Sequence, residues 1–307
     1  MKSCIFGPVP SRRLGLSLGI DLTPHKTCSL DCIYCECGKT TNLTITRKIW
    51  RPTKKVLAEL SDKLKEIKSL DYITFSGAGE PTLSKNIGCL ILKIKKIYNI
   101  PICVLTNSTL LTEKKVVEDL LTADIVIPSL DAATAETFKI INRPIENLDI
   151  ENIIQALIDF RKLYKNKLFL EILLVKDINN SPEELKALSK AADKIKPDKI
   201  QLNTCVRPGT ENNIRQLSFE ELNAAAKYFN FTVDIISAFS KNKDAFIDNE
   251  SIINLIKRRP CTIADISAIT SLTFEQVLEK IELLKARGIK IIEKQNENGM
   301  YYFIEQI

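Results

Sequence analysis

The strongest constraint on the fold is a repeated alternation of short β-prone runs and longer amphipathic stretches between residues 15 and 236. Short apolar runs separated by helical segments are typical of βα units whose strands pair in parallel. We identify six such units, with strands expected at Leu16 to Leu22, Tyr72 to Ser76, Ile102 to Thr106, Ile125 to Ser129, Leu168 to Val175 and Lys199 to Leu202. Six consecutive units predict a partial or complete α/β barrel, or a doubly wound sheet, with helices outside. In either fold, functional side chains collect at the C-terminal ends of the strands.

Helix start signals support this alternation. Ser181, followed by Pro182 and Glu184, supplies a cap, a first-turn proline and a capping-box acid in that order. Ser218 with Glu221 repeats the capping box. The segment from 53 to 67 places apolar residues three and four apart, which predicts a helix with one buried face.

The pattern changes after residue 236, and the 307-residue length fits one large domain and one small one. Residues 237–249 are polar and predict a linker. Three helical patterns follow, at 250–258, 263–269 and 273–287, and then two β-prone runs around Asn298-Gly299 predict a hairpin. We therefore expect a barrel domain at 1–236, a linker at 237–249 and a winged helix-turn-helix domain at 250–307.

No apolar run approaches the roughly 20 residues that span a bilayer, and the first 25 residues lack a signal-peptide core. We therefore expect a cytoplasmic protein without a membrane partner. In a reducing compartment the nine cysteines are not explained as structural disulfides. Four of them crowd into ten residues: Cys28, Cys32, Cys35 and Cys37. This clustering indicates a metal site.

The basic excess of the chain lies around that cluster. Residues 1–55 hold ten Lys/Arg against three Asp/Glu, whereas residues 250–307 hold eight of each. Such an excess favours an anionic substrate or cofactor, although a solvated basic surface is the more common explanation of charge alone.

Cys28, Cys32 and Cys35 have the spacing C-x3-C-x2-C directly after the first expected strand. A structural zinc site usually takes four ligands in two well-separated pairs, and a second pair is missing. Three thiolates in one loop can hold three irons of a four-iron cluster and leave the fourth iron open. A zinc site with Cys37 as the fourth ligand remains the alternative, and the tight spacing matches it poorly.

This cysteine loop, with Tyr34 just before the third cysteine and a six-unit βα frame around it, resembles the radical S-adenosylmethionine (SAM) superfamily. The resemblance implies a partial (β/α)6 TIM-like barrel with a [4Fe-4S] cluster whose open iron binds the amino and carboxylate groups of SAM. It also implies that the reduced cluster splits SAM into methionine and a 5'-deoxyadenosyl radical, which abstracts hydrogen from a substrate. In such enzymes the protein supplies binding, orientation and exclusion of water.

Further motifs match this superfamily at successive strand ends. Ala78-Gly79-Glu80-Pro81 resembles its Gly-Gly-Glu-Pro loop, with Ala in place of the first Gly, and implies binding of the SAM amino group. Thr106-Asn107 and Ser129 with Asp131 match positions that contact the methionyl and ribose parts of SAM. Taken alone, each of these would be ordinary turn or capping chemistry. The predicted cofactor-binding residues are Tyr34, Ala78, Gly79, Glu80, Thr106, Asn107, Ser129 and Asp131.

Substrate contacts are predicted from position only. Glu171 lies in the fifth expected strand, and Asn203 and Arg207 follow the sixth. The Arg12-Arg13 pair suits a phosphate or carboxylate group of a substrate. Cys37 and Cys205 are the least ordinary of the other cysteines, and a thiol facing the substrate is the alternative to simple packing.

The segment Gly7 to Gly15 looks like the branch grouped with wyosine-type tRNA-modifying radical SAM proteins. The leading hypothesis is thus an enzyme acting on RNA or another macromolecule, with a ferredoxin or flavodoxin as electron donor. The neutral charge of residues 250–307 weakens the RNA assignment, because phosphate binding needs cationic density. A peptide-modifying radical SAM enzyme and a non-enzymatic iron-sulfur DNA-binding regulator are the alternatives, and methyl transfer is open as an overall outcome.

Overall fold

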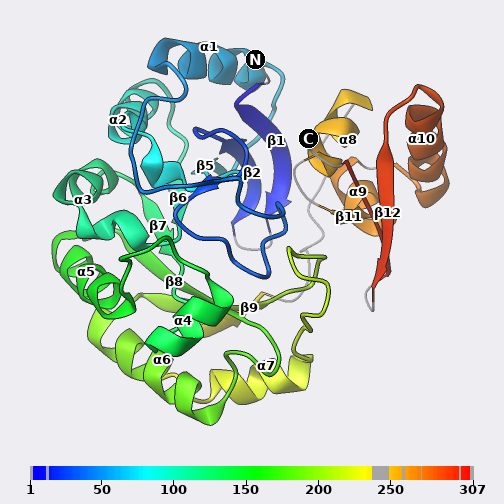
Figure 1. Ribbon diagram of the computed structural model, residues 1–307. Helices are drawn as coiled ribbons and strands as arrows, with labels where there is room; N and C mark the ends of the chain where they lie inside the picture. Colours follow the sequence, from blue (N-terminus) through cyan, green and yellow to red (C-terminus); the bar gives the residue numbers. More distant parts are fainter. Residues whose placement is uncertain are drawn as a thin grey trace.

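The structure is a computed structural model, and it describes residues 3–11, 14–236, 249–257, 260–270, 272–296 and 299–304. Its larger part is an eight-stranded sheet surrounded by helices, and its smaller part contains the last three helices and a three-stranded sheet (Figure 1). None of the helices in these ranges is long and apolar enough to cross a membrane.

The large sheet has the strand order β1-β2-β5-β6-β7-β8-β9-β10. All neighbouring strands from β2 to β10 are parallel, and β1 pairs with β2 in the antiparallel direction. The order has two free ends, so the sheet is a partial barrel, as expected. The strands are β1 (Ile5–Ser11), β2 (Gly15–Ile20), β5 (Tyr72–Phe75), β6 (Ile102–Thr106), β7 (Ile125–Pro128), β8 (Lys167–Leu174), β9 (Lys199–Thr204) and β10 (Val233–Ile235).

The helices of this part cover the outside of the sheet (Figure 1). They are α1 (Thr53–Lys65), α2 (Ile87–Ile97), α3 (Lys114–Leu120), α4 (Ala135–Ile141), α5 (Ile150–Leu163), α6 (Pro182–Ile195) and α7 (Phe219–Ala226), with short 3-10 helices at Pro81–Leu83 and Thr109–Thr112. The sequence-based start signals are confirmed: the Ser181 hydroxyl accepts a hydrogen bond from the Glu184 amide, and Ser218 and Glu221 form a capping box.

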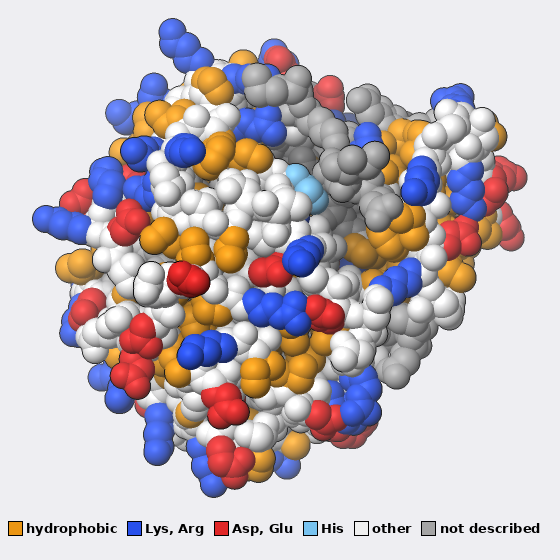
Figure 2. Space-filling view, viewed as in Figure 1, with side chains coloured by type: hydrophobic (Ala, Val, Ile, Leu, Met, Phe, Trp, Pro, Cys, Tyr) orange, Lys and Arg blue, Asp and Glu red, His pale blue; other side chains and the backbone are white. Residues whose placement is uncertain are grey.

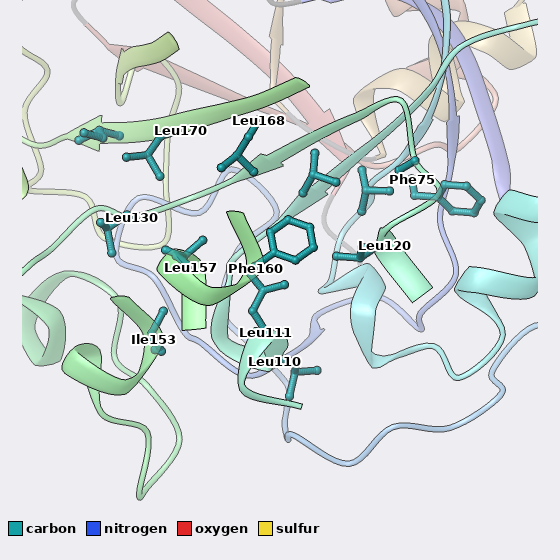
Figure 3. Packing of buried hydrophobic residues seen from close by; sticks show 14 of the residues in the cluster. Phe75, Leu110, Leu111, Leu120, Leu130, Ile153, Leu157, Phe160, Leu168 and Leu170 are labelled. Carbon is teal, nitrogen blue, oxygen red and sulfur yellow. The ribbon is translucent and has the colours of Figure 1, made fainter. Parts of the chain in front are cut away.

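One apolar core lies between the sheet and these helices. Figure 3 shows side chains from strands and from helices converging on it, among them Phe75, Leu157, Phe160 and Leu170. Phe160 stacks on Tyr164 with ring centroids 5.0 Å apart, and the Tyr164 hydroxyl donates to the Ala123 carbonyl at 2.9 Å. The outer face of the strands is apolar because it packs on the helices, whereas the inner face also carries polar side chains, among them Ser17, Thr74 and Glu171.

The sheet is wider than the sequence pattern predicts. Strand β1 is missed because Gly7, Pro8 and Pro10 are typical of turns, and the register shift between Phe6 and Val9 accommodates that stretch. Strand β10 has only three residues and carries little pattern. Strand β9 ends two residues later than predicted, at Thr204, which places Asn203 inside the strand and not after it.

The C-terminal part contains α8 (Asn249–Ile256), α9 (Ile263–Thr270) and α10 (Phe274–Ala286) and a sheet of order β11-β13-β12. Its strands are β11 (Cys261–Thr262), β12 (Ile291–Asn296) and β13 (Gly299–Ile304), of which the sequence pattern misses β11. The expected hairpin is present in the register Asn296 to Gly299. The winged-helix class and the domain boundaries stay predictions, and most of the expected linker lies outside the described residues.

The two parts touch beside strand β1 and the connection that follows β9. Val9 packs against the apolar core of the C-terminal part, which is separate from the main core. The Tyr301 hydroxyl donates to the Val206 carbonyl at 2.8 Å, and Lys294 donates to Asn212. The C-terminal part is therefore joined to the segment that follows β9.

Candidate cluster and cofactor site

The cysteine loop lies in the long connection between β2 and α1, at the C-terminal end of the first parallel strand. Two short strands hold it: β3 (Thr27–Cys28) pairs with β4 (Asn42–Leu43), and the Thr44 amide donates to the Cys28 carbonyl at 2.8 Å. A turn follows, in which the Cys35 amide donates to the Cys32 carbonyl at 3.1 Å. The backbone thus fixes all three cysteines of the C-x3-C-x2-C spacing.

Each of these three sulfurs has its own nitrogen donor, and the donors come from three different elements. The Lys26 ammonium lies 3.0 Å from the Cys35 sulfur, at the start of the same loop. The side-chain amide of Asn107, after β6, lies 3.4 Å from the Cys28 sulfur. The side-chain amide of Asn142, after α4, lies 3.4 Å from the Cys32 sulfur. Donors to sulfur stabilise thiolates and influence the potential of an iron-sulfur cluster.

The three thiols have unequal acidities. A hydrogen bond from Cys37 and the nearby Lys26 ammonium lower the pKa of Cys35, although burial acts in the opposite direction. Burial is the main cause that raises the pKa of Cys28 to about 12, and the Glu80 carboxylate adds to it. Cys35 is therefore the first of these thiols to reach the thiolate form that binds metal.

The arrangement does not suit a single metal ion. In the described part of the chain, no three Cys, His, Asp or Glu side chains converge on one point that could hold such an ion. The Cys37 thiol is hydrogen-bonded to the Cys35 sulfur. A four-iron cluster fits better, because each thiolate then binds a different iron.

The loop after β5 approaches the cysteine loop closely. A Cβ atom on Gly79 would lie 2.3 Å from the Thr27 carbonyl oxygen and 2.6 Å from the Thr23 hydroxyl, so a larger residue does not fit there. The Thr23 hydroxyl is buried and has no hydrogen-bond partner. Gly79 therefore allows the β5 loop to pack directly on the cysteine loop. The three cysteine sulfurs are ligands that fit an iron-sulfur cluster, and the unpartnered Thr23 hydroxyl is a buried polar group that fits a bound cofactor such as SAM.

The Glu80 side chain is buried and fully engaged within the chain. One carboxylate oxygen accepts from the Thr82 amide at 3.0 Å and from the hydroxyls of Thr82 and Thr106 at 2.5 and 2.7 Å. The other carboxylate oxygen accepts from the backbone amide of Asn107 at 2.8 Å. Burial raises the pKa of Glu80, and these four donors act against that shift. Glu80 therefore joins the β5 loop to the end of β6 and places Asn107 beside Cys28.

Ser129 and Asp131 follow β7, as predicted, and Asp131 links three elements. Its side chain accepts hydrogen bonds from the Tyr34 hydroxyl, from the Asn142 amide at 3.0 Å and from the Leu173 backbone amide at 2.9 Å. Burial raises the pKa of Asp131 to about 6, although these donors lower it. Asp131 thus holds Tyr34 and, through Asn142, the surroundings of Cys32.

A cavity of about 310 Å³ opens inside the curved sheet beside the cysteine loop. Five residues predicted to bind the cofactor or the substrate line this cavity: Tyr34, Ser129, Asp131, Glu171 and Asn203. Cys205, for which a thiol facing the substrate was one expectation, lines it as well. The Asn203 amide donates to the Glu171 carboxylate at 3.2 Å. Asn107, Ser129 and Asp131 also border a small adjoining cavity of about 40 Å³. Of the remaining predicted cofactor-binding residues, Ala78 to Glu80 lie in the loop after β5, and Thr106 is the last residue of β6.

Arg207 does not line this cavity. Arg207 is buried, and its guanidinium lies 3.0 and 3.1 Å from the two carboxylate oxygens of Glu36. Glu36 stands between Cys35 and Cys37 in the sequence. Its Nε lies 3.7 Å from Asp265 in α9. The structure therefore gives Arg207 a position that joins the cysteine loop to the C-terminal part, and not the substrate-facing position predicted for it. Arg12 and Arg13 lie outside the described residues.

Sequence reasoning missed two site residues. Lys26 and Asn142 contact cysteine sulfurs, and only Lys26 stands near the cysteine motif in the sequence. Asn142 follows a helix 107 residues after Cys35 and resembles an ordinary helix C-cap, so no local pattern marks it. Only the folded sheet brings two residues so far apart in the sequence into contact.

The sequence profile of the Radical SAM superfamily matches residues 22–189, more than half of the chain. A protein named GTPase Obg from Brachyspira hyodysenteriae is 42% identical over 290 residues, which is 92% of this chain and 43% of that protein. The chain therefore spans less than half of that relative. GTPases of the phosphate-loop type carry the motif G-x-x-x-x-G-K-[ST]. This chain has Gly38-Lys39-Thr40, but Ile33 stands at the position of the first glycine, so the motif is incomplete.

A UPF0026 protein of Methanocaldococcus jannaschii is 32% identical over 98% of this chain and 92% of its own length. Among solved structures, a radical SAM methyltransferase from Sphaerobacter thermophilus has a TM-score of 0.54 at 15% identity, over 71% of this chain and 65% of that one. The structure of TYW1 with a lysine-pyruvate adduct has a TM-score of 0.53 at 19% identity, over 69% and 72%. These two likenesses concern the fold.

Replacement of single cysteines tests the ligand set. After anaerobic reconstitution, we expect Cys28→Ala, Cys32→Ala and Cys35→Ala each to lose the bound iron and the visible absorption of the cluster. Cys37→Ala should keep both, because Cys37 contacts a sulfur ligand and is not one itself. Iron and sulfide analysis measures this, and equal loss of iron in Cys37→Ala would contradict the assignment.

Replacement of Arg207 tests its junction. Arg207→Met leaves Glu36 and Asp265 without their shared cation, so we expect a loss of more than about 1 kcal/mol of stability, below the roughly 3–5 kcal/mol of a fully buried pair. We also expect lower cluster occupancy. Arg143→Met is the matched control, since the Arg143–Glu211 pair is exposed and such pairs contribute about 0–1 kcal/mol. Chemical denaturation measures the free energy of unfolding, and iron analysis measures the cluster occupancy. Equal values for Arg207→Met and Arg143→Met would contradict the role of Arg207 in joining the cysteine loop to the C-terminal part.

Proposed function

Since the chain belongs to the radical SAM superfamily, we propose that it cleaves SAM reductively and uses the resulting radical to modify a macromolecular substrate. Members of this superfamily are enzymes that use a [4Fe-4S] cluster and SAM, so the regulator alternative is set aside. The observation that carries the proposal is the set of three cysteine sulfurs with separate nitrogen donors beside the cavity of the curved sheet.

When bound, the cluster and SAM supply one-electron chemistry and a 5'-deoxyadenosyl radical. The chain's own residues provide the rest. Cys28, Cys32 and Cys35 would hold the cluster, and the ammonium of Lys26 and the amides of Asn107 and Asn142 would stabilise charge on their sulfurs. The cavity is lined by residues of the strands and of the cysteine loop, so a substrate bound there would lie beside the cluster site.

The predicted cofactor residues receive more specific roles in this proposal. The backbone of Ala78 and Gly79 faces the cysteine loop and would receive the SAM amino group, while the carboxylate of Glu80 holds that loop in place. Tyr34, Ser129 and Asp131 line the cavity and would position the ribose part. Glu171 and Asn203 would meet the substrate deeper in the same cavity.

RNA is the first proposed class of macromolecule. Its support is the basic excess of residues 1–55 beside the cluster site and the likeness of the N-terminal segment to tRNA-modifying radical SAM proteins. In Figure 2, Lys and Arg side chains gather over α1 at the top of the view. Basic surfaces of this kind attract phosphate groups over long distances.

A peptide is the second proposed class, and a specific observation favours it. Helix α10, the third helix of the expected winged-helix domain, exposes the apolar side chains of Phe274, Leu278 and Leu283 to solvent. Exposed apolar side chains on one helix suit a protein or peptide partner better than a phosphate backbone. The C-terminal part would then act as a peptide-recognition module.

The products of SAM test the reaction directly. After anaerobic reconstitution and reduction with dithionite, we expect 5'-deoxyadenosine from the wild type and none from Cys32→Ala, measured by chromatography and mass spectrometry. S-adenosylhomocysteine in place of 5'-deoxyadenosine would contradict reductive cleavage and indicate methyl transfer. A wild type that binds a full cluster and releases neither product, even with cell-derived RNA and peptides added, would refute the proposal.

The salt dependence of binding separates the two substrate classes. For RNA, the logarithm of the association constant should fall linearly with the logarithm of salt concentration, with a slope set by the number of phosphate contacts. For a peptide held on the apolar side chains of α10, salt should change the affinity little, and Phe274→Ser with Leu278→Ser should weaken binding. RNA binding that is unaffected by salt would contradict the RNA proposal.

A further inference from the structure

The connection between the cysteine loop and α1 carries basic and aliphatic side chains and no acidic one. Residues 38–52, which lead from the cysteine loop to α1, include four Lys/Arg and no Asp or Glu. Three aliphatic side chains of this connection are exposed, at 41% for Leu43, 42% for Ile45 and 61% for Ile49. We call the residues Lys39, Leu43, Ile45, Lys48 and Ile49 the connection patch. Exposed aliphatic side chains so close together in the chain indicate an interaction surface.

This segment is anchored to the barrel, so its exposed side chains are displayed on a fixed backbone. Arg47 points inward and is buried, with its guanidinium 2.7 Å from Asp119 and 2.8 Å from the Thr82 carbonyl. The backbone amide of Lys48 donates to the Leu83 carbonyl at 3.0 Å. Because these contacts order the segment in advance, a partner that binds there loses little free energy to ordering it.

The connection patch lies next to one of the cluster ligands. Leu43 in β4 is the register partner of Cys28 in β3, and the Thr44 amide donates to the Cys28 carbonyl at 2.8 Å. A protein that covers Leu43 is therefore one strand away from a cysteine that holds the cluster. In Figure 1 this connection, drawn in blue, crosses the front of the barrel before it enters α1.

We propose that the connection patch is the docking surface of an acidic one-electron carrier protein of the flavodoxin type. The inference rests on the proposed reductive cleavage of SAM, which takes one electron from outside the chain. In the transfer, the carrier's reduced flavin, as its anion, gives up one electron and keeps its proton. The electron would go to the cluster that Cys28, Cys32 and Cys35 would hold, which would be reduced by one electron.

Charge and patch size favour this occupant. An acidic carrier complements the exposed ammonium groups of Lys39 and Lys48, and electron-transfer contacts are typically small and guided by charge. The basic residues of the connection also contribute to the excess that supports RNA as a substrate, but RNA fits the connection patch itself less well, because single-stranded bases stack on aromatic side chains. The only aromatic residue of the connection, Trp50, is half-buried, and the Lys48 ammonium lies 5.3 Å from its ring centroid. Exposed Leu and Ile side chains provide a protein contact instead.

The test uses the reconstituted full chain and reduced bacterial flavodoxin as the probe. Two double variants change the patch: Ile45→Ser with Ile49→Ser, and Lys39→Glu with Lys48→Glu. The matched control is Ile97→Ser with Leu163→Ser, which are exposed by 60% and 59% at the C-terminal ends of α2 and α5. These helix ends lead toward the N-terminal ends of strands, on the opposite side of the barrel from the cysteine loop. Flavodoxin affinity is measured by titration calorimetry, and cluster reduction by stopped-flow absorbance.

We expect both patch variants to bind flavodoxin more weakly. The Lys39→Glu with Lys48→Glu variant should be reduced by flavodoxin about tenfold more slowly or worse, because charge guidance alone is worth roughly 10- to 1,000-fold in association rate. The serine variant should also be reduced more slowly, because it loses apolar contact area. The serine patch variant should still be reduced by dithionite at the wild-type rate and cleave SAM, since its cluster is unchanged. The control variant should behave as the wild type in every assay.

Three results would overturn the inference. The first is that flavodoxin binds the patch variants and the control variant with equal affinity and reduces their clusters at equal rates. Another is loss of RNA binding in the patch variants with flavodoxin reduction intact, which would make the patch an RNA contact. The third is equal slowing with dithionite and flavodoxin, which would mean damage to the cluster. Failure of the wild type to cleave SAM with dithionite would instead refute the proposed function, and the calorimetric comparison would still decide where flavodoxin binds.

Discussion

Three cysteine sulfurs brought together in one partly buried loop repel each other as thiolates, and the surrounding structure is organised to offset that repulsion. Each sulfur has a separate nitrogen donor, from Lys26 in the same loop, Asn107 after β6 and Asn142 after α4. Asn107 and Asn142 reach their sulfurs only when the parallel strands are paired, because they are 79 and 110 residues away from them in the chain. The site and the sheet therefore depend on each other, and an unfolded chain has no preformed cluster site.

Two buried carboxylates extend this dependence beyond the first contacts. Glu80 accepts four hydrogen bonds and fixes Asn107, while Asp131 accepts from Tyr34 and Asn142. On the other side of the loop, Glu36 binds Arg207, which also faces Asp265 in the C-terminal part. The cysteine loop is consequently held by strand ends on one side and by the junction with the C-terminal part on the other.

The strands, the cysteine motif and the strand-end polar residues were predictable because each leaves a local pattern. Short apolar runs predict strands such as β6 exactly, and Ser181 and Ser218 carry their capping partners three residues away. Strand β1 was not predictable, since its glycine and prolines indicate turns and only pairing with β2 makes it a strand. The position of Arg207 was predicted wrongly, because a charged residue after a strand end does not reveal that Glu36 and Asp265 will take its charge.

The central claim is that Cys28, Cys32 and Cys35 hold three irons of a four-iron cluster and leave the fourth open beside the cavity. Electron paramagnetic resonance of the reduced, reconstituted protein with and without SAM tests it most directly. If SAM binds an iron that has no cysteine ligand, the reduced protein should give one [4Fe-4S]+ signal whose g-values change when SAM is added. A signal that is identical with and without saturating SAM would contradict the account.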